Sequence, residues 1–117
     1  MLIVEDDIVL ADAIKIALES EGYNLLMAQD GNEALDILSA NKVNMVLLDL
    51  LLPNKNGFEV LKEMKGNINQ RDIPVLILTN FEQEASIEDA IKMGAVDYLI
   101  KANINIKDIP GLVSKYI

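Results

Sequence analysis

The sequence predicts an α/β protein in which five strand–helix units form a doubly wound, five-stranded parallel sheet. Two observations predict this class. Short apolar runs alternate with segments of helical periodicity along the 117 residues, and the first, third and fourth runs are apolar without interruption. Uninterrupted apolar strands are typical of parallel sheets that are covered on both faces, and right-handed helical crossovers supply that cover. The length suits one core, and no linker or repeat is visible, so we expect one domain over residues 1–117.

The apolar runs define the expected strands, which are residues 1–4, 24–28, 45–48, 74–79 and 97–100. Each strand is followed by apolar residues at helical spacing. These positions are Leu10, Ala13, Ile14, Ala17 and Leu18; the run 30–38; Phe58, Leu61 and Met64; Ile87, Ala90 and Ile91; and Leu112, Val113 and Tyr116. Gly22, Gly66 and Gly94 mark helix ends, Asp30 is a candidate N-cap, and Pro110 fits a first helical turn.

Composition excludes several kinds of function. The chain has no cysteine and no histidine, which removes disulfides, thiolate zinc sites, imidazole bases and Ser-His triads. A net charge of −9 disfavours direct contact with nucleic acid or with an anionic membrane. No apolar run is long enough to span a bilayer, and no signal peptide is visible, so we expect a cytoplasmic protein.

Polar side chains lie at the carboxyl ends of four of the five expected strands. They are Glu5, Asp6 and Asp7; Asp49; Thr79 and Asn80; and Lys101. Ligands of doubly wound sheets bind beyond the carboxyl ends of the strands, so these residues are expected to share one edge. Each has an ordinary alternative role: the acids as helix or turn caps, Thr79 as a strand end and Lys101 as a solvated lysine. Their joint placement favours a shared site.

The chemistry of this edge suits phosphoryl transfer. Crowded carboxylates repel one another unless a cation neutralises them, and an open site with few carboxylates suits Mg²⁺. Lys101 adds a fixed positive charge, and the Thr79 hydroxyl is able to donate a hydrogen bond to an anionic oxygen. Without cysteine or histidine, the carboxylate of Asp49 is the obvious nucleophile, and its product would be an aspartyl phosphate.

Four motifs make the chain resemble the receiver domain of two-component response regulators, including the chemotaxis receivers. They are "IVEDD" at the first strand, "LLDLLLPNKNGFEVL" around Asp49, "ILTN" at the fourth strand and "GAVDYLIK" at the fifth. The resemblance covers the whole chain. It implies a flavodoxin-like fold with strand order 2-1-3-4-5.

The resemblance also implies roles for individual residues. Asp49 would accept a phosphoryl group from a phosphohistidine, and Lys101 would pair with the phosphoryl oxygen. Glu5 and Asp6 would hold Mg²⁺ together with Asp49 and the backbone carbonyl of Leu51. Asp7 is not clearly a ligand and is a candidate cap for the first helix. The domain would not be an enzyme acting on outside substrates, although it would assist its own phosphorylation and dephosphorylation.

Thr79 and Tyr98 resemble the family's switch pair. Phosphorylation would draw the Thr79 hydroxyl towards the phosphate, and the Tyr98 ring would swing inward, which changes a partner-binding surface. The implied partners are a sensor histidine kinase or a histidine phosphotransfer protein, and a downstream protein or output domain. A phosphorylation-dependent homodimer is left open.

Three departures from the family pattern stand at the rim of the site. Ala102 replaces the usual proline after the lysine, so the Lys101–Ala102 bond is expected to be trans or strained. Asn80 replaces a small residue and would either crowd the phosphate or donate a hydrogen bond to it. Leu51 and Phe81 are apolar, from which we predict slow hydrolysis of the acyl phosphate, faster in a Phe81→Glu variant.

Three other classes of function compete with this one. A Mg²⁺-dependent phosphohydrolase usually needs a second acid two residues after the nucleophile, where this chain has Leu51. A flavin or nucleotide carrier needs a glycine-rich first loop, where this chain has "EDDI". A degenerate receiver that only binds partners remains an alternative because of Asn80 and Ala102.

Overall fold

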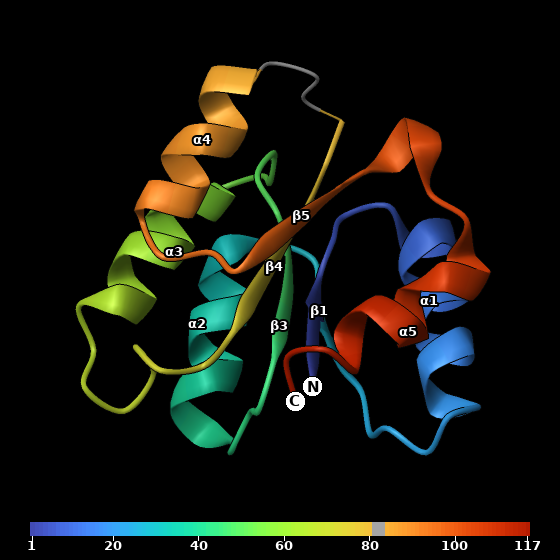
Figure 1. Ribbon diagram of the computed structural model, residues 1–117. Helices are drawn as coiled ribbons and strands as arrows, with labels where there is room; N and C mark the ends of the chain where they lie inside the picture. The colour runs from blue at the N-terminus through green and yellow to red at the C-terminus, as the bar shows by residue number, and fades with distance from the viewer. Residues whose placement is uncertain (81–83) are drawn as a thin grey trace.

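The computed structural model describes residues 1–80 and 84–117, and it confirms the predicted class (Figure 1). Five parallel strands lie in the order β2-β1-β3-β4-β5, as expected. The strands are β1 (Leu2–Val4), β2 (Leu26–Ala28), β3 (Val46–Asp49), β4 (Val75–Thr79) and β5 (Asp97–Ile100). The helices are α1 (Ile8–Glu19), α2 (Gly31–Ala40), α3 (Gly57–Lys65), α4 (Glu84–Lys92) and α5 (Ile109–Val113). Two 3-10 turns, η1 (Lys101–Asn103) and η2 (Ile106–Asp108), connect β5 to α5.

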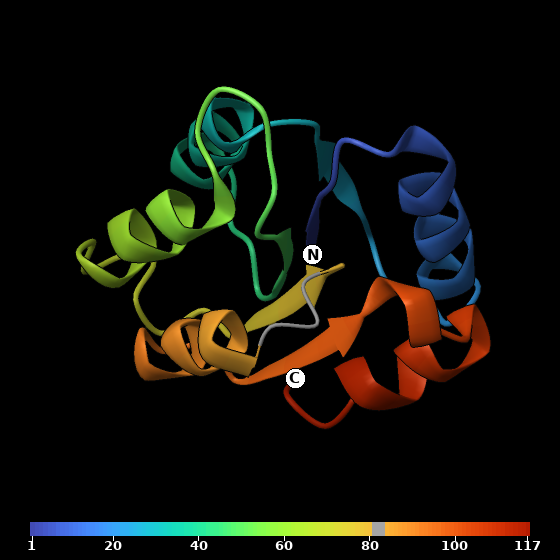
Figure 2. The same ribbon diagram turned by 90° about the horizontal axis from the view of Figure 1, so that it is seen from above.

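The helices form two layers, one on each face of the sheet. Seen from above, α1 and α5 lie on one side, and α2, α3 and α4 lie on the other (Figure 2). Successive residues of β1 show why: Leu2 and Val4 belong to the apolar cluster under α2 and α3, whereas Ile3 belongs to the cluster under α1 and α5. All residues of β1, β3 and β4 are buried, which confirms that these strands are covered on both faces.

The register of the strands sets the position of the polar residues. Val4, the last residue of β1, pairs with Leu48, so Glu5 follows beside Asp49, the last residue of β3. Thr79 pairs with Ile100, so the residue after β5 is Lys101 at the same edge. The chain runs from β1 to β2 on one side, and from β2 it crosses to β3 on the other side of β1. The topological switch point therefore lies between β1 and β3.

Side-chain caps fix the start of three helices near this edge. The Asp7 carboxylate accepts from the Leu10 N–H and begins α1, which confirms its expected role as a cap. Asp30 begins α2 in the same way. The reciprocal capping box lies at α3, between Asn56 and Glu59.

Several boundaries differ from the sequence prediction. Strand β2 begins at Leu26, two residues later than expected, because only three residues pair with β1 at this sheet edge. Tyr116 was expected within the last helix but lies beyond α5. Ile91, expected on one helix face with Ile87 and Ala90, is 41% exposed on α4. Pro110 stands in the first turn of α5, as expected. Among the residues that the structure describes, no helix is long and apolar enough to cross a membrane.

Candidate functional site

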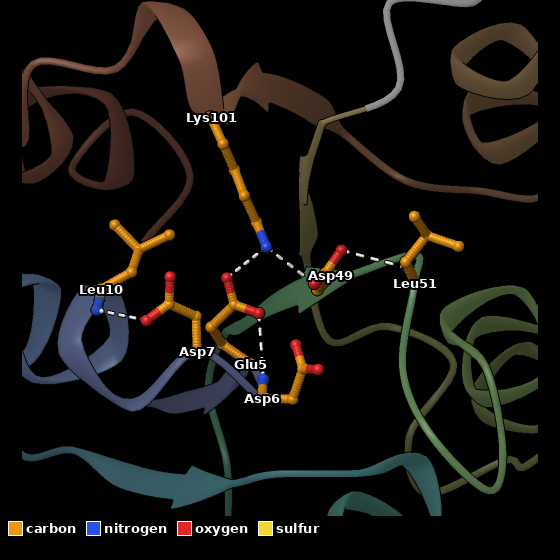
Figure 3. Close-up of polar contacts among 7 residues, drawn as sticks. All are labelled: Glu5, Asp6, Asp7, Leu10, Asp49, Leu51 and Lys101. Atoms are coloured by element: carbon orange, nitrogen blue, oxygen red, sulfur yellow. Dashed lines mark hydrogen bonds and ion pairs between the residues drawn. The ribbon is translucent and has the colours of Figure 1, made fainter.

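One lysine joins carboxylates at the carboxyl ends of two neighbouring strands, β1 and β3 (Figure 3). The Nζ atom of Lys101 lies 2.8 Å from Oδ2 of Asp49, which is 52 residues away in the sequence. The same ammonium group forms an ion pair with Oε1 of Glu5. Glu5 and Asp49 are 1% and 2% exposed, so the Lys101 ammonium group compensates the charge of two carboxylates that are almost completely buried.

Burial gives Glu5 unusual acid–base behaviour. Desolvation, together with the adjacent Asp49 carboxylate, raises the pKa of Glu5 from 4.5 to about 7, against the opposing effect of Lys101. Burial lowers the pKa of Lys101, but its bonds to Asp49 and Glu5 outweigh this effect, so the pKa of the ammonium group is raised. Lys101 therefore stays charged, whereas Glu5 holds a proton over part of the neutral range.

Three carboxylates converge in a way that suits a hard cation. One oxygen each of Glu5, Asp6 and Asp49 lies within 4.8 Å of the others. Asp6 is exposed while the other two are buried, so the cluster opens to solvent on the Asp6 side. Asp7 turns its carboxylate towards α1 instead (Figure 3). An all-oxygen set with an open side matches Mg²⁺, which retains several water ligands.

A small open pocket of about 280 Å³ lies above these groups, and its lining is Asp6, Asp7, Asp49, Leu51, Asn80 and Lys101. The pocket is therefore lined by the Asp49 carboxylate and the Lys101 ammonium group and contains open space. Asp49 is further fixed from the opposite side, because its Oδ1 accepts from the Leu51 N–H at 3.1 Å. The Leu51 side chain is 55% exposed at the rim, in agreement with its expected position.

The two residues expected to form a switch occupy different environments. Thr79 is completely buried at the end of β4, on the strand that pairs with the Asp49 strand. Tyr98 is 44% exposed on β5 and lines a groove of about 620 Å³ with Ile87 and Ile91 of α4. Tyr98 thus borders α4 and is not among the residues that line the carboxylate pocket.

The structure describes two of the three residues expected at the rim of the site, Asn80 and Ala102. Asn80 lines the pocket, and Ala102 is exposed in η1. The described residues contain no cis peptide bond, so the Lys101–Ala102 bond is trans, one of the two outcomes expected. Phe81 lies outside the described residues.

Two features of the site had no signal in the sequence. The first is the shared pairing of Lys101, since spacing along the chain does not tell which carboxylates a lysine reaches. The second is the contact between Asp30 and the loop after Asp49, where the Asn54 side-chain amide donates to Oδ2 of Asp30 at 2.9 Å. Only the cap role of Asp30 was visible beforehand.

Comparison with known proteins identifies the class to which this fold and site belong. The family model described as the response regulator receiver domain matches residues 1–112. The chain therefore belongs to the response regulator receiver domain family.

Individual relatives agree with this assignment. Response regulator RR06 of Streptococcus pneumoniae serotype 2 is 34% identical over 120 residues, which cover 99% of this chain and 54% of that protein. The chain thus spans about half the length of this relative. The Francisella response regulator 1452 receiver domain is 28% identical with a TM-score of 0.89, over 98% of this chain and 93% of that one. The Mn²⁺-bound form of response regulator Rcp1 is 31% identical with a TM-score of 0.83, over 97% and 88% of the two chains.

Proposed function

We propose that residues 1–117 form a phosphorylation-controlled signalling domain that accepts a phosphoryl group on Asp49 in the presence of Mg²⁺. One observation carries the proposal: a buried carboxylate at the end of β3 has a lysine ammonium group 2.8 Å away and two further acids around it. This combination serves a nucleophile that must gain a dianionic group. The family membership of the chain supports it.

The transfer itself needs little covalent chemistry from the protein. An oxygen of Asp49 forms a bond to phosphorus while the bond between phosphorus and the donor imidazole nitrogen breaks, and the leaving imidazole takes up a proton. Lys101 neutralises charge on the incoming phosphoryl oxygens, and its ammonium group is already positioned beside the acceptor. The hydrogen bond from the Leu51 N–H holds the acceptor carboxylate in one orientation.

The acidic cluster fits a divalent ion. Glu5, Asp6 and Asp49 would hold Mg²⁺, with the Leu51 carbonyl as a further ligand, and the bound ion would supply charge neutralisation for the phosphoryl group. Two observations support this fit: the cluster contains only oxygen donors, and burial leaves Glu5 with a raised pKa that a metal ion would relieve. A protein of similar structure, response regulator Rcp1, has been crystallised in a Mn²⁺-bound form.

The output would be a change in the surface around β5. Thr79 would turn towards the phosphoryl group, and Tyr98, which is half-exposed beside α4, would move inward. A local charge change would then bias an element with two arrangements. The partners would be a sensor histidine kinase or a histidine phosphotransfer protein on the input side, and a downstream protein, an output domain or a second copy on the output side, all in the cytoplasm. Binding of partners without phosphorylation is not favoured, because the acceptor, the lysine and the acids lie together.

Intact-mass measurement tests the proposal directly. The protein is incubated with acetyl phosphate and Mg²⁺, and separately with a phosphorylated histidine kinase. A gain of one phosphoryl group is expected in the wild type and is expected to be absent in Asp49→Asn, which keeps the shape of the acceptor. Asp36→Asn, the same change at an exposed acid of α2, is the matched control and should be phosphorylated normally. No gain in the wild type with either donor would refute the proposal.

A further inference from the structure

A backbone hydrogen bond joins the two ends of the loop between β3 and α3, which are the base of the loop. The Gly57 N–H donates to the Leu50 carbonyl at 3.0 Å, which closes the loop. A Cβ atom at Gly57 would lie only 2.2 Å from the Asp49 carbonyl oxygen, so the first residue of α3 packs directly against the backbone of the acceptor. Backbone contacts therefore help to fix the base of the loop.

The tip of the same loop, at Asn54, is hydrogen-bonded to the N-cap of a different helix, α2. Asn54 has a φ of 65°, a left-handed conformation that asparagine tolerates better than most residues. Its side-chain amide donates to Oδ2 of Asp30 at 2.9 Å, across 24 residues of sequence. Beside this bond, a Cβ atom at Gly31 would lie 2.1 Å from the Lys55 carbonyl oxygen, so the loop backbone rests on the first residue of α2.

Asp30 uses both of its carboxylate oxygens. Oδ1 accepts from the Glu33 N–H at 2.8 Å and begins α2, while Oδ2 accepts from Asn54. The side chain therefore joins a rigid element, the start of α2, to the tip of an otherwise exposed loop. Leu51, whose N–H orients Asp49, lies between the base and the tip of that loop.

We propose that Asp30 and Asn54 are positioning residues, which hold the β3–α3 loop in the conformation that presents Leu51 to the metal ion. The inference rests on the proposed function, since it concerns the affinity of that same site for Mg²⁺. Neither residue contacts the acidic cluster. Their bond restricts the loop before the ion binds, so its loss lowers the fraction of molecules in the binding conformation and raises the apparent Kd.

Three variants test the proposal. Asn54→Gly removes the amide and still permits the left-handed backbone. The double variant Asp30→Asn with Asn54→Asp exchanges donor and acceptor, keeps the net charge and keeps an N-capping side chain. Asn41→Gly is the matched control: it also removes a side-chain hydrogen bond, to the Ile37 carbonyl, but at the far end of α2.

The readouts are the Kd for Mg²⁺, followed by amide chemical shifts during titration, and the melting temperature. Asn54→Gly is expected to weaken Mg²⁺ binding about fivefold, which matches the net contribution of one typical intramolecular hydrogen bond. The exchanged double variant is expected to bind as the wild type does, and so is Asn41→Gly. In the metal-free state, amide signals of residues 50–56 are expected to broaden or shift in Asn54→Gly only.

Equal Mg²⁺ affinities in Asn54→Gly and Asn41→Gly would overturn the positioning role, and so would a double variant as weak as Asn54→Gly. If the wild type binds Mg²⁺ and is phosphorylated while Asn54→Gly is unchanged, the positioning role alone fails. If the wild type neither binds Mg²⁺ nor gains a phosphoryl group, the proposed function fails with it.

Discussion

Protonation of Glu5 should make Mg²⁺ binding depend on pH in the neutral range. A carboxylate must lose its proton to bind the ion, and burial raises the pKa of Glu5 from 4.5 to about 7. At pH 8 the carboxylate is mostly ionised, whereas at pH 6 only about one molecule in ten is ready to bind. The apparent Kd for Mg²⁺ should therefore rise about tenfold between pH 8 and pH 6.

The same raised pKa links pH to the stability of the metal-free protein. The folded state holds the Glu5 proton more tightly than the unfolded chain does. This stabilisation is complete below pH 4.5 and is lost as the pH rises through about 7. The shift corresponds to about 3 kcal/mol of unfolding free energy. Mg²⁺ at pH 8 should restore much of it, because the ion compensates the carboxylate that the proton has left.

Isothermal titration calorimetry at pH 6, 7 and 8 measures the Kd, and two buffers of different ionisation enthalpy report the protons released per ion. The matched variant is Glu5→Gln, which has the same shape and no titrating group. It should bind Mg²⁺ more weakly at pH 8, with less than about twofold change down to pH 6. A wild-type Kd that does not change from pH 8 to pH 6, or an equally steep dependence in Glu5→Gln, would refute the reasoning.

Three further predictions concern residues around Asp49. Lys101→Ala leaves two buried carboxylates without their cation. Urea denaturation should therefore show a loss of about 3 kcal/mol of unfolding free energy without Mg²⁺ and a smaller loss with it; equal losses would contradict compensation of the carboxylates by the ion. Gly57→Ala places a Cβ atom 2.2 Å from the Asp49 carbonyl oxygen and should lower the unfolding free energy by about 2 kcal/mol. Gly111→Ala is the control, because the added Cβ atom meets nothing within 4 Å, and it should leave the unfolding free energy unchanged or raise it in the same urea denaturation. Leu51→Glu should shorten the lifetime of the Asp49 phosphate in intact-mass time courses, because a carboxylate at the exposed rim attracts and orients water; an unchanged lifetime would contradict a role for the apolar rim.

Much of the fold follows from local patterns in the sequence. Alternation of apolar runs with helical periodicity predicts the strand–helix units, because each element must bury one face or both. The errors lie where pairing partners set the boundary: β2 is short because it pairs over only three residues. Helical spacing predicts that Ile91 shares a face with Ile87, but it does not tell whether another element covers that face. In the structure Ile91 is 41% exposed.

The candidate site was also predictable in outline. Parallel strands place their carboxyl ends at one edge, so the acids, Thr79 and Lys101 had to lie near one another. The rest depended on contacts between distant segments. Nothing in the spacing indicates that Asn54 reaches Asp30, because that bond depends on how the loop rests on α2.

The sequence by itself determines the fold class, the order of the elements and the residue types at the functional edge, because hydrophobic periodicity is a local property. Only the tertiary structure decides the charge state of the site. Glu5 and Asp6 are neighbours and chemically alike, yet one is buried with a raised pKa and the other is exposed. That difference arises because Lys101 and Asp49, which are distant in the sequence, close over one of the two acids, and burial is set by the packing of the whole chain.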